Sequence, residues 1–351
     1  MKAWEANIRK VVPYVPGEQP KDKDVIKLNT NENPYPPSPM VREALRNLNV
    51  DQFRKYPDPA ITALVNELAG YYGVKPENVF VGVGSDDVLA MAFMTFFNSS
   101  KPILFPDITY SFYDVWADLL NIPYETQKLD ENFQIVKEDY LKENGGIIFP
   151  NPNAPTGVLQ ELSVVEEIIS KNQDSIVIVD EAYIDFGGES ALPLIEKYDN
   201  LLVVQTFSKS RSMAGMRIGY AFGGEKLIKY LNDVKYSFNS YTMNQTSIDL
   251  GVACVQDKEY FENTVQKIIK TREWTKEELK KLGFSFQDSM SNFIFATHES
   301  RKAKEIFEAL REHKIYVRYF NKPRIDNFLR ISIGTDAEMQ QLIAFLKDYL
   351  K

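Results

Sequence analysis

The sequence contains one lysine whose neighbours suit covalent chemistry. Lys209 lies in the hydroxyl-rich segment Thr206-Phe207-Ser208-Lys209-Ser210, directly after the apolar run 201–205, and Arg217 follows eight residues later. A lysine amine can form a Schiff base, and hydroxyl groups with an arginine can hold a phosphate. Most lone lysines are solvated surface residues, but this one follows a strand-like run. The segment therefore indicates a reactive lysine beside a phosphate pocket.

Three further apolar runs end in residues that could face a ligand. They are followed by Gly84-Ser85-Asp86-Asp87, Asn151-Pro152-Asn153-Ala154-Pro155-Thr156-Gly157 and Asp180-Glu181-Ala182-Tyr183. Small residues at a helix start leave backbone N–H groups free for a phosphate, although a plain capping turn reads the same way. Taken alone, the proline-rich segment is better explained as a tight turn than as a ligand site. The acidic pair resembles a Walker B strand, but the sequence has no P-loop, and Gly82-x-Gly84 lacks the third glycine of a dinucleotide fingerprint.

The elements around these segments alternate between strands and helices. Apolar runs predict buried strands, and helical periodicity fills the gaps between them. We expect strands at 79–83, 102–105, 146–149, 175–179, 201–205 and 218–222 and helices at 39–48, 60–72, 88–97, 110–120 and 162–171. This alternation is typical of an α/β fold with a mostly parallel sheet between helices, whose ligands bind at the carboxyl ends of strands.

The two ends of the chain have a different character. Prolines and asparagines make residues 11–39 an irregular arm. A long helix at 256–282, strands at 293–296, 315–318 and 328–333, and helices at 301–313 and 336–350 predict a small α+β domain. We therefore expect a large domain from residues 40–250, and a small one that combines residues 1–39 with 251–351.

Composition narrows the class of protein. The 351 residues carry a net charge of −8, which argues against nucleic-acid binding. A charged start without an apolar segment and the lack of a long apolar run predict a cytoplasmic protein with no membrane partner. One cysteine excludes an intrachain disulfide framework. His298 and His313 have no metal-ligand spacing, so we expect no metal site and both rings at the surface.

Taken together, the four strand ends resemble the fold-type-I family of pyridoxal-phosphate enzymes over essentially the whole chain. Within it, four segments look like those of histidinol-phosphate aminotransferases: Leu28-Asn29-Thr30-Asn31-Glu32-Asn33-Pro34, Lys55-Tyr56-Pro57-Asp58, Asp180-Glu181-Ala182-Tyr183 and Leu329-Arg330-Ile331-Ser332-Ile333-Gly334-Thr335. One segment departs from the family pattern Asn-Pro-x-Asn-Pro-Thr-Gly, because Ala154 stands where the second asparagine would donate to the cofactor oxygen O3′.

The resemblance implies a cofactor, pyridoxal 5′-phosphate, and a role for each matching residue. Lys209 would form the Schiff base, Asp180 would pair with the pyridine nitrogen, and Tyr183 would donate to O3′; these three are the expected catalytic residues. Tyr110 would stack on the cofactor ring. The expected phosphate cup consists of Gly84, Ser85, Asp86, Thr206, Ser208 and Arg217. Asn153 is a further expected cofactor ligand, with a weaker claim because of Ala154.

The same resemblance implies the substrates and a partner. Arg330, Arg318 and Tyr14 would bind the anionic end of the substrate, since planar guanidinium groups bind phosphate in a bidentate manner, and Asn33 would close over it. Tyr56 would reach the cofactor phosphate of a neighbouring subunit, which implies a homodimer with shared active sites.

The implied reaction interconverts L-histidinol phosphate and imidazole-acetol phosphate, with glutamate and 2-oxoglutarate as the second pair, in histidine biosynthesis. Three alternatives stay open: a threonine-phosphate decarboxylase, an aromatic or broad-range aminotransferase, and a non-catalytic cofactor-binding module. The last is disfavoured because no DNA-binding segment is appended.

Overall fold

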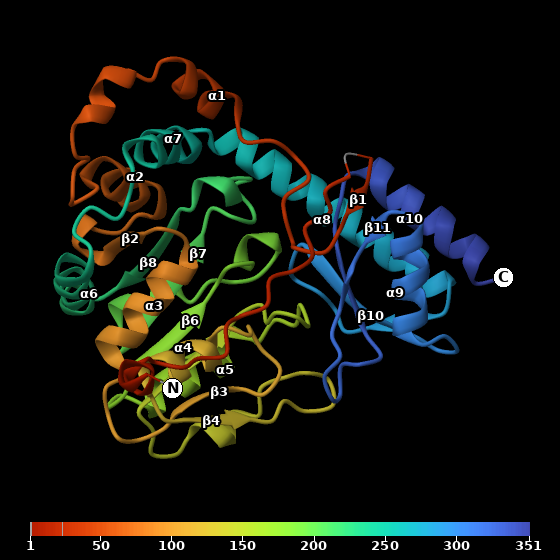
Figure 1. The fold of residues 1–351 in the computed structure, drawn as a ribbon, viewed down its shortest axis with the longest axis horizontal. Coiled ribbons are helices and arrows are strands. Elements are labelled where there is room, and N and C mark those ends of the chain that lie inside the picture. The colour runs from red at the N-terminus through yellow and green to blue at the C-terminus, as the bar shows by residue number, and fades with distance from the viewer. Residues whose placement is uncertain (1, 23) are drawn as a thin grey trace.

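The computed structural model describes residues 2–22 and 24–351, which form a seven-stranded sheet, a four-stranded sheet and a two-stranded sheet with helices around them (Figure 1). The larger sheet has seven strands in the order β2-β8-β7-β6-β5-β3-β4. In chain order they are β2 (Val79–Gly82), β3 (Ile103–Pro106), β4 (Tyr124–Gln127), β5 (Gly146–Pro150), β6 (Val177–Asp180), β7 (Leu201–Thr206) and β8 (Gly219–Gly223). Only β8 runs against its neighbours β2 and β7, so the expected mostly parallel sheet is confirmed.

Helices enclose this sheet because its strands are apolar on both faces. Every residue of β2, β3, β5, β6, β7 and β8 is buried, as expected for a parallel sheet covered on two sides. The surrounding helices are α1 (Pro39–Arg46), α2 (Thr62–Tyr72), α3 (Ser85–Phe96), α4 (Tyr113–Leu120), α5 (Leu162–Lys171), α6 (Glu225–Phe238) and α7 (Gln245–Gln256). The sequence analysis missed α6, α7 and β4, and it began α4 at Tyr110, three residues early.

The C-terminal third builds the smaller sheet, in the order β12-β13-β10-β9. Its strands are β9 (Phe284–Phe286), β10 (Phe293–His298), β12 (Arg318–Tyr319) and β13 (Leu329–Ser332), and the helices α9 (Ala303–Glu312) and α10 (Asp336–Tyr349) lie beside it. The long helix α8 (Lys258–Lys281) runs from the region of the large sheet to the region of the small one (Figure 1). The strand β1 (Ile26–Lys27) of the N-terminal arm pairs in parallel with β11 (Ile315–Tyr316), which joins the two ends of the chain.

One prediction about the small sheet was wrong. His298 is only 8% exposed, because its Nε2 lies 2.8 Å from the carbonyl oxygen of Leu282 and its Nδ1 accepts from the backbone N–H groups of Ser300 and Arg301. The ring is therefore a satisfied buried group, whereas His313 is exposed as expected. In the described part of the chain, no helix is both long and apolar enough to cross a membrane.

Candidate active site

A cavity of about 170 Å³ brings together six of the predicted site residues. Tyr14, Tyr110, Tyr183, Lys209, Arg318 and Arg330 line it, and they come from the arm, the ends of the large sheet and the small sheet. The largest of their sequence separations, from Tyr14 to Arg330, exceeds 300 residues, so only the tertiary fold places them together. The cavity has a lysine end, built on the strands of the large sheet, and an arginine end, built on β12 and β13.

The lysine end begins where β7 ends. Lys209 follows this buried strand, and its Nζ lies 3.5 Å from the carbonyl oxygen of Thr30 and 5.7 Å from the centre of the Tyr183 ring. Thr206 and Ser208 are buried under the turn, with their hydroxyl oxygens 3.0 Å apart. The side chain is half-buried, so its amine is held beside a phenol while it remains open to the cavity.

Asn33 holds the lysine turn from the outside. Its Nδ2 donates to the carbonyl oxygens of Lys209 and Ser210, each at 3.0 Å, and its Oδ1 accepts from the backbone N–H of Tyr35. These contacts occupy both amide hydrogens. The structure therefore places Asn33 against the backbone of the reactive lysine and outside the cavity lining.

Asp180 supplies a buried carboxylate at the end of β6. It is 4% exposed, and its Oδ2 accepts from the Tyr113 hydroxyl at 2.9 Å. Burial raises the pKa of the Asp180 carboxyl to about 6, although the hydrogen bond from Tyr113 opposes the shift. The negative charge of this buried carboxylate is poorly solvated. A positive partner, such as a protonated pyridine nitrogen, would stabilise it.

The expected phosphate cup lies at the start of α3. Tyr110 donates from its hydroxyl to Oδ1 of Asp86 at 2.7 Å, and Nη2 of Arg217 lies 3.3 Å from Oδ2 of the same carboxylate. Gly84 has a φ of +89°, and a Cβ there would lie 2.5 Å from Nη2 of Arg217. The close approach of backbone, arginine and helix N-terminus, next to Ser85, is a suitable geometry for an anion.

The arginine end presents two guanidinium groups on adjacent strands. Arg318 and Arg330 are directly paired in the register of β12 and β13. Nη2 of Arg330 donates to the carbonyl oxygen of Asn29 at 2.9 Å, while its Nε is buried without a hydrogen-bond partner in the described structure. Burial, together with the nearby charge of Arg318, lowers the pKa of Arg330. Two cations and a free buried donor at one place favour an anionic ligand.

Aromatic rings complete this end of the cavity. Tyr14 stacks on Phe112 with ring centres 4.2 Å apart, so the N-terminal arm is fixed over the opening. Phe320 lies 5.5 Å from both guanidinium groups. The arginines thus face a partly apolar wall, where a charged hydrogen bond is stronger than in water.

Two further predicted residues, like Asn33, do not line the cavity. Tyr56 is 80% exposed and packs against Tyr241, with ring centres 4.6 Å apart. Asn153 is buried beside the cavity, and its Nδ2 donates to the Ile108 carbonyl and the Thr156 hydroxyl, which leaves its Oδ1 unpartnered. Neither arrangement excludes the predicted role, but neither residue lines the cavity within one chain.

The sequence analysis assigned no role to two residues that support the site. Tyr113 binds Asp180, and Asn31, whose Nδ2 lies 3.0 Å from the Tyr183 hydroxyl, lines the cavity. Asn31 has a φ of +56°, a left-handed conformation that asparagine tolerates better than most residues. Its position in the segment Asn29-Thr30-Asn31-Glu32-Asn33 was the only signal available in the sequence.

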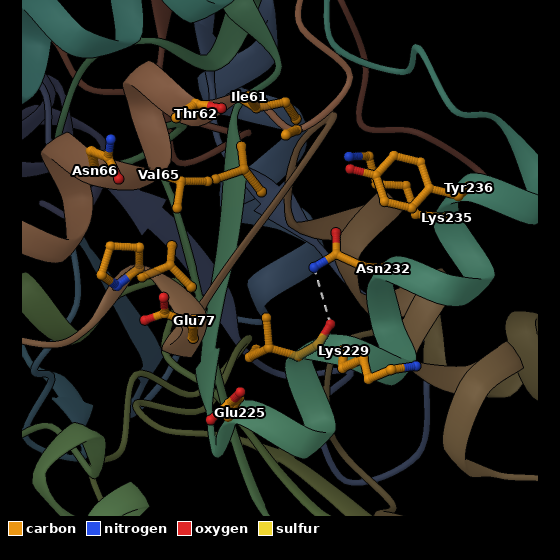
Figure 2. A pocket seen from close by; sticks show the side chains of 15 residues that line it. Ile61, Thr62, Val65, Asn66, Glu77, Glu225, Lys229, Asn232, Lys235 and Tyr236 are labelled. Carbon is orange, nitrogen blue, oxygen red and sulfur yellow. Dashed lines mark hydrogen bonds between the residues drawn. The ribbon is translucent and has the colours of Figure 1, made fainter.

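A second cavity, of about 380 Å³, lies between α2, β2 and α6 (Figure 2). None of the predicted site residues lines it. Three of its polar side chains are bound to protein neighbours: Nδ2 of Asn232 donates to the Ile228 carbonyl, Lys235 donates to the Pro59 carbonyl at 2.6 Å, and Lys229 pairs with Asp233. Six of the predicted site residues thus line the first cavity, and none lines this one.

The comparisons with known proteins agree with this geometry. A family model described as aminotransferase class I and II matches residues 23–346. The chain is therefore a class I and II aminotransferase by family.

Individual relatives narrow the family. The chain is 51% identical over 349 residues to a histidinol-phosphate aminotransferase from Lactococcus lactis, covering 99% of this chain and 97% of the relative. It is 53% identical over 347 residues to one from Clostridium acetobutylicum, covering 99% of both. The chain thus belongs to the histidinol-phosphate aminotransferase family. A solved structure of the Sinorhizobium meliloti enzyme with pyridoxal-5′-phosphate has the same fold, with a TM-score of 0.84 at 23% identity, covering 93% of this chain and 90% of that one.

Proposed function

We propose that this protein is a pyridoxal-phosphate aminotransferase that interconverts L-histidinol phosphate and imidazole-acetol phosphate, with glutamate and 2-oxoglutarate as the second pair, in histidine biosynthesis. Family membership supports the reaction class. The observation that supports the substrate assignment is the cavity itself. It has Lys209 at one end and the pair Arg318 and Arg330 at the other. A substrate with an amine at one end and an anion at the other fits this polarity.

The residues at the lysine end fit the cofactor. The donor set contains an amine, a buried carboxylate, a phenol and an anion pocket at the start of α3, and the backbone at Gly84 closes tightly on Arg217. Lys209, Asp180, Tyr183, Tyr110 and the cup of Gly84, Ser85, Asp86, Thr206, Ser208 and Arg217 would hold it, with Asn153 beside them. When bound, pyridoxal phosphate supplies an aldehyde for the amine and a ring that accepts electrons from the substrate Cα.

The side chains have separate tasks in this scheme. The amine of Lys209 would take the proton from the substrate Cα and pass it to C4′ of the cofactor, and general acid–base catalysis requires both atoms to be within its reach. The carboxylate of Asp180 keeps a proton on the pyridine nitrogen. The hydroxyl of Tyr183 donates to the ring oxygen.

The arginine end must serve two substrates in turn. L-Histidinol phosphate presents a phosphate ester, whereas glutamate presents carboxylates, and both are planar or tetrahedral anions that guanidinium groups bind through paired N–H donors. Arg318 and Arg330 would bind either anion, with Tyr14 as an additional donor, and Asn33 would act at the edge of the site. The ring of Phe320 lies beside both guanidinium groups as an apolar wall of the cavity.

We propose a homodimer in which Tyr56 reaches the cofactor phosphate of the second subunit. The 80% exposure of Tyr56 and the neighbouring exposed rings of Phe53 and Tyr241 support a protein-covered surface. Mixing Tyr56→Phe and Lys209→Ala chains tests the shared site. A hybrid dimer with one intact site should regain part of the activity that the two separate homodimers lack, and a monomer by solution mass measurement would contradict it.

The domain division and the location are part of the same proposal. A large domain of residues 40–250 would bind the cofactor, and the arm 1–39 with residues 251–351 would form the small domain. The pairing of β1 with β11 supports the joint origin of the small domain. A role in amino-acid biosynthesis supports a cytoplasmic location.

The activity is tested with L-histidinol phosphate and 2-oxoglutarate. Formation of glutamate, dependent on added pyridoxal phosphate, is the expected result. Release of carbon dioxide from threonine phosphate without glutamate formation would indicate the decarboxylase alternative instead. Equal turnover of phenylalanine or tyrosine would indicate a broad-range aminotransferase.

A further inference from the structure

Among the described residues of the N-terminal arm, Asn31 is the one whose side-chain amide bonds to a proposed catalytic side chain. It is 1% exposed and lies where the arm contacts β13. Its Nδ2 is 3.0 Å from the hydroxyl oxygen of Tyr183. No role follows for it from the proposed reaction alone, since it is neither acid, base nor cation.

The surrounding hydrogen bonds fix the direction of the Asn31 amide. The backbone N–H of Asn31 donates to Oγ of Ser332 at 2.9 Å, and that hydroxyl donates to Oδ1 of Asn31 at 3.0 Å. Turning the amide over would leave the hydroxyl hydrogen of the buried Ser332 without an acceptor here. The backbone carbonyl oxygen of Asn31 accepts a hydrogen bond from Nδ2 of Asn292, which fixes the main chain at this position. The nitrogen of the amide therefore faces Tyr183.

This orientation determines what the phenol can do. An amide nitrogen only donates, so the Tyr183 oxygen must accept from it, and the single hydroxyl hydrogen is left for another partner. Tyr183 lines the cavity, so this hydrogen is available on the cavity side. A neighbour that accepted hydrogen bonds would instead draw the hydrogen away.

We propose that Asn31 is a positioning residue that directs the Tyr183 hydroxyl hydrogen toward the ring oxygen O3′ of pyridoxal phosphate. The inference rests on the proposed function, because it gives Tyr183 its acceptor. It also explains how the site manages with Ala154 where the family pattern has a second amide donor: the remaining donor is held in one direction by the arm and by β13.

The decisive variant is Asn31→Asp. It keeps the size of the side chain, its tolerance of a positive φ and the acceptor for Ser332, but it replaces the donor to Tyr183 with an acceptor. The phenol hydrogen then turns to the new carboxylate. The readout is the pH midpoint of the visible absorption of bound pyridoxal phosphate, because a donor to the ring oxygen favours its deprotonated form. We expect the midpoint to rise by about one pH unit, a tenfold change in apparent proton affinity.

The new negative charge could raise the midpoint by itself, and other groups also face the phenol. Lys209 lies 5.7 Å from its ring, and Arg330, Tyr110 and Tyr113 are close enough to interact with it electrostatically. The experiment is therefore a double-mutant cycle with Tyr183→Phe, which leaves these groups in place. If Asn31 acts through the Tyr183 hydroxyl, Asn31→Asp should shift the midpoint only slightly when Tyr183 is already replaced by Phe.

A second variant changes no charge. Ser332→Ala removes the hydroxyl that orients the Asn31 amide, and we expect a smaller shift of the same sign that also disappears with Tyr183→Phe. Melting curves of each variant without cofactor show whether that variant is folded. If Asn31→Asp is not folded, the midpoint shift of Ser332→Ala tests the inference. An unchanged midpoint, or equal shifts with and without the phenol, would overturn the inference and leave the proposed function intact. A parent protein that shows no cofactor absorption would overturn the proposed function, and this inference with it.

Discussion

The two ends of the cavity differ in how far their polar groups are already satisfied. At the lysine end, the carboxylate of Asp180, the phenol of Tyr183 and the backbone of Lys209 each have a protein partner. Oδ1 of Asn153, beside these groups, is the exception. At the arginine end, Nε of a charged guanidinium, that of Arg330, is buried without a partner. The large sheet supplies the first group of residues and the small sheet supplies the second.

This difference matches the two kinds of ligand that the proposed reaction requires. A resident cofactor is bound once, so its ligands can be fixed by the fold beforehand, and such preorganisation favours catalysis. Substrates enter and leave, and their anionic ends supply the missing partner each time. The lowered pKa of Arg330, caused by burial and by the proximity of Arg318, reflects a charge that a bound anion would stabilise.

The largest expected effect is at the lysine end. Lys209→Ala should lower kcat/KM by at least about 100-fold, because the proton-transfer group is lost. It should also abolish the visible absorption that borohydride bleaches in the parent. Absorption spectra with and without borohydride measure this. Lys229→Ala, at an exposed lysine paired with Asp233, is the control that should keep both properties. A Lys209→Ala protein that keeps the bleachable absorption would show that another lysine binds the cofactor.

The next largest effect is at the arginine end. Arg330→Gln should lower kcat/KM for L-histidinol phosphate and for glutamate by about 10- to 100-fold, as expected for loss of a charged hydrogen bond. Arg318→Gln should have a smaller effect, because the buried Nε without a hydrogen-bond partner belongs to Arg330. The absorption of bound cofactor should persist in both. Steady-state kinetics with each substrate measure the loss, with the exposed Arg311→Gln as control. Loss of the cofactor absorption instead would mean that the two ends are not separate.

A third effect concerns stability without cofactor. The folded-state pKa of Asp180 is raised to about 6, so the folded protein binds this proton more tightly than the unfolded chain, and stability falls as pH rises from about 4 through 6. Asp180→Asn removes this loss and should be more stable than the parent by up to about 3 kcal/mol at pH 7. Urea unfolding at several pH values measures the difference. It should shrink toward pH 4, whereas a difference independent of pH would assign it to packing. The exposed Asp233→Asn serves as control.

The smallest effect is expected at Ala154, the departure from the family pattern. Ala154→Asn adds an amide beside the cavity, where Ala154 is 6% exposed. Because the direction of the Tyr183 hydrogen bond is already set, we expect the cofactor Kd to change by less than about tenfold. Spectral titration measures the Kd, and Ala154→Val separates added bulk from the added donor. Tightening by 100-fold or more would mean that the lysine end is incompletely satisfied.

The parts of this site that sequence patterns predicted are those controlled by local rules. Lys209 and Asp180 follow apolar strands, and such positions come together at one edge of a parallel sheet. The reversal of β8 was not predictable, because a buried strand reads the same in either direction. The helices α6 and α7 were missed although α6 buries Leu227, Ile228 and Leu231 at helical spacing.

Hydrogen bonds between residues far apart in the sequence were not predicted from sequence patterns. Asn33 appeared as a residue that closes over substrate, whereas its amide binds the backbone of Lys209, 176 residues away. Asn31 and Tyr183 are 152 residues apart, and no spacing rule relates them. The burial of His298 likewise depends on Leu282 and the turn after β10. Contacts of this kind follow from tertiary packing, which local periodicity does not contain.

The central claim is that the arginine end recognises the phosphate of the substrate. The ratio of kcat/KM for L-histidinol phosphate to that for L-histidinol tests it most directly, in the parent and in Arg330→Gln. We predict a large preference for the phosphorylated substrate in the parent and a fall of at least about tenfold in this ratio in the variant. A ratio that stays the same in Arg330→Gln would contradict the account.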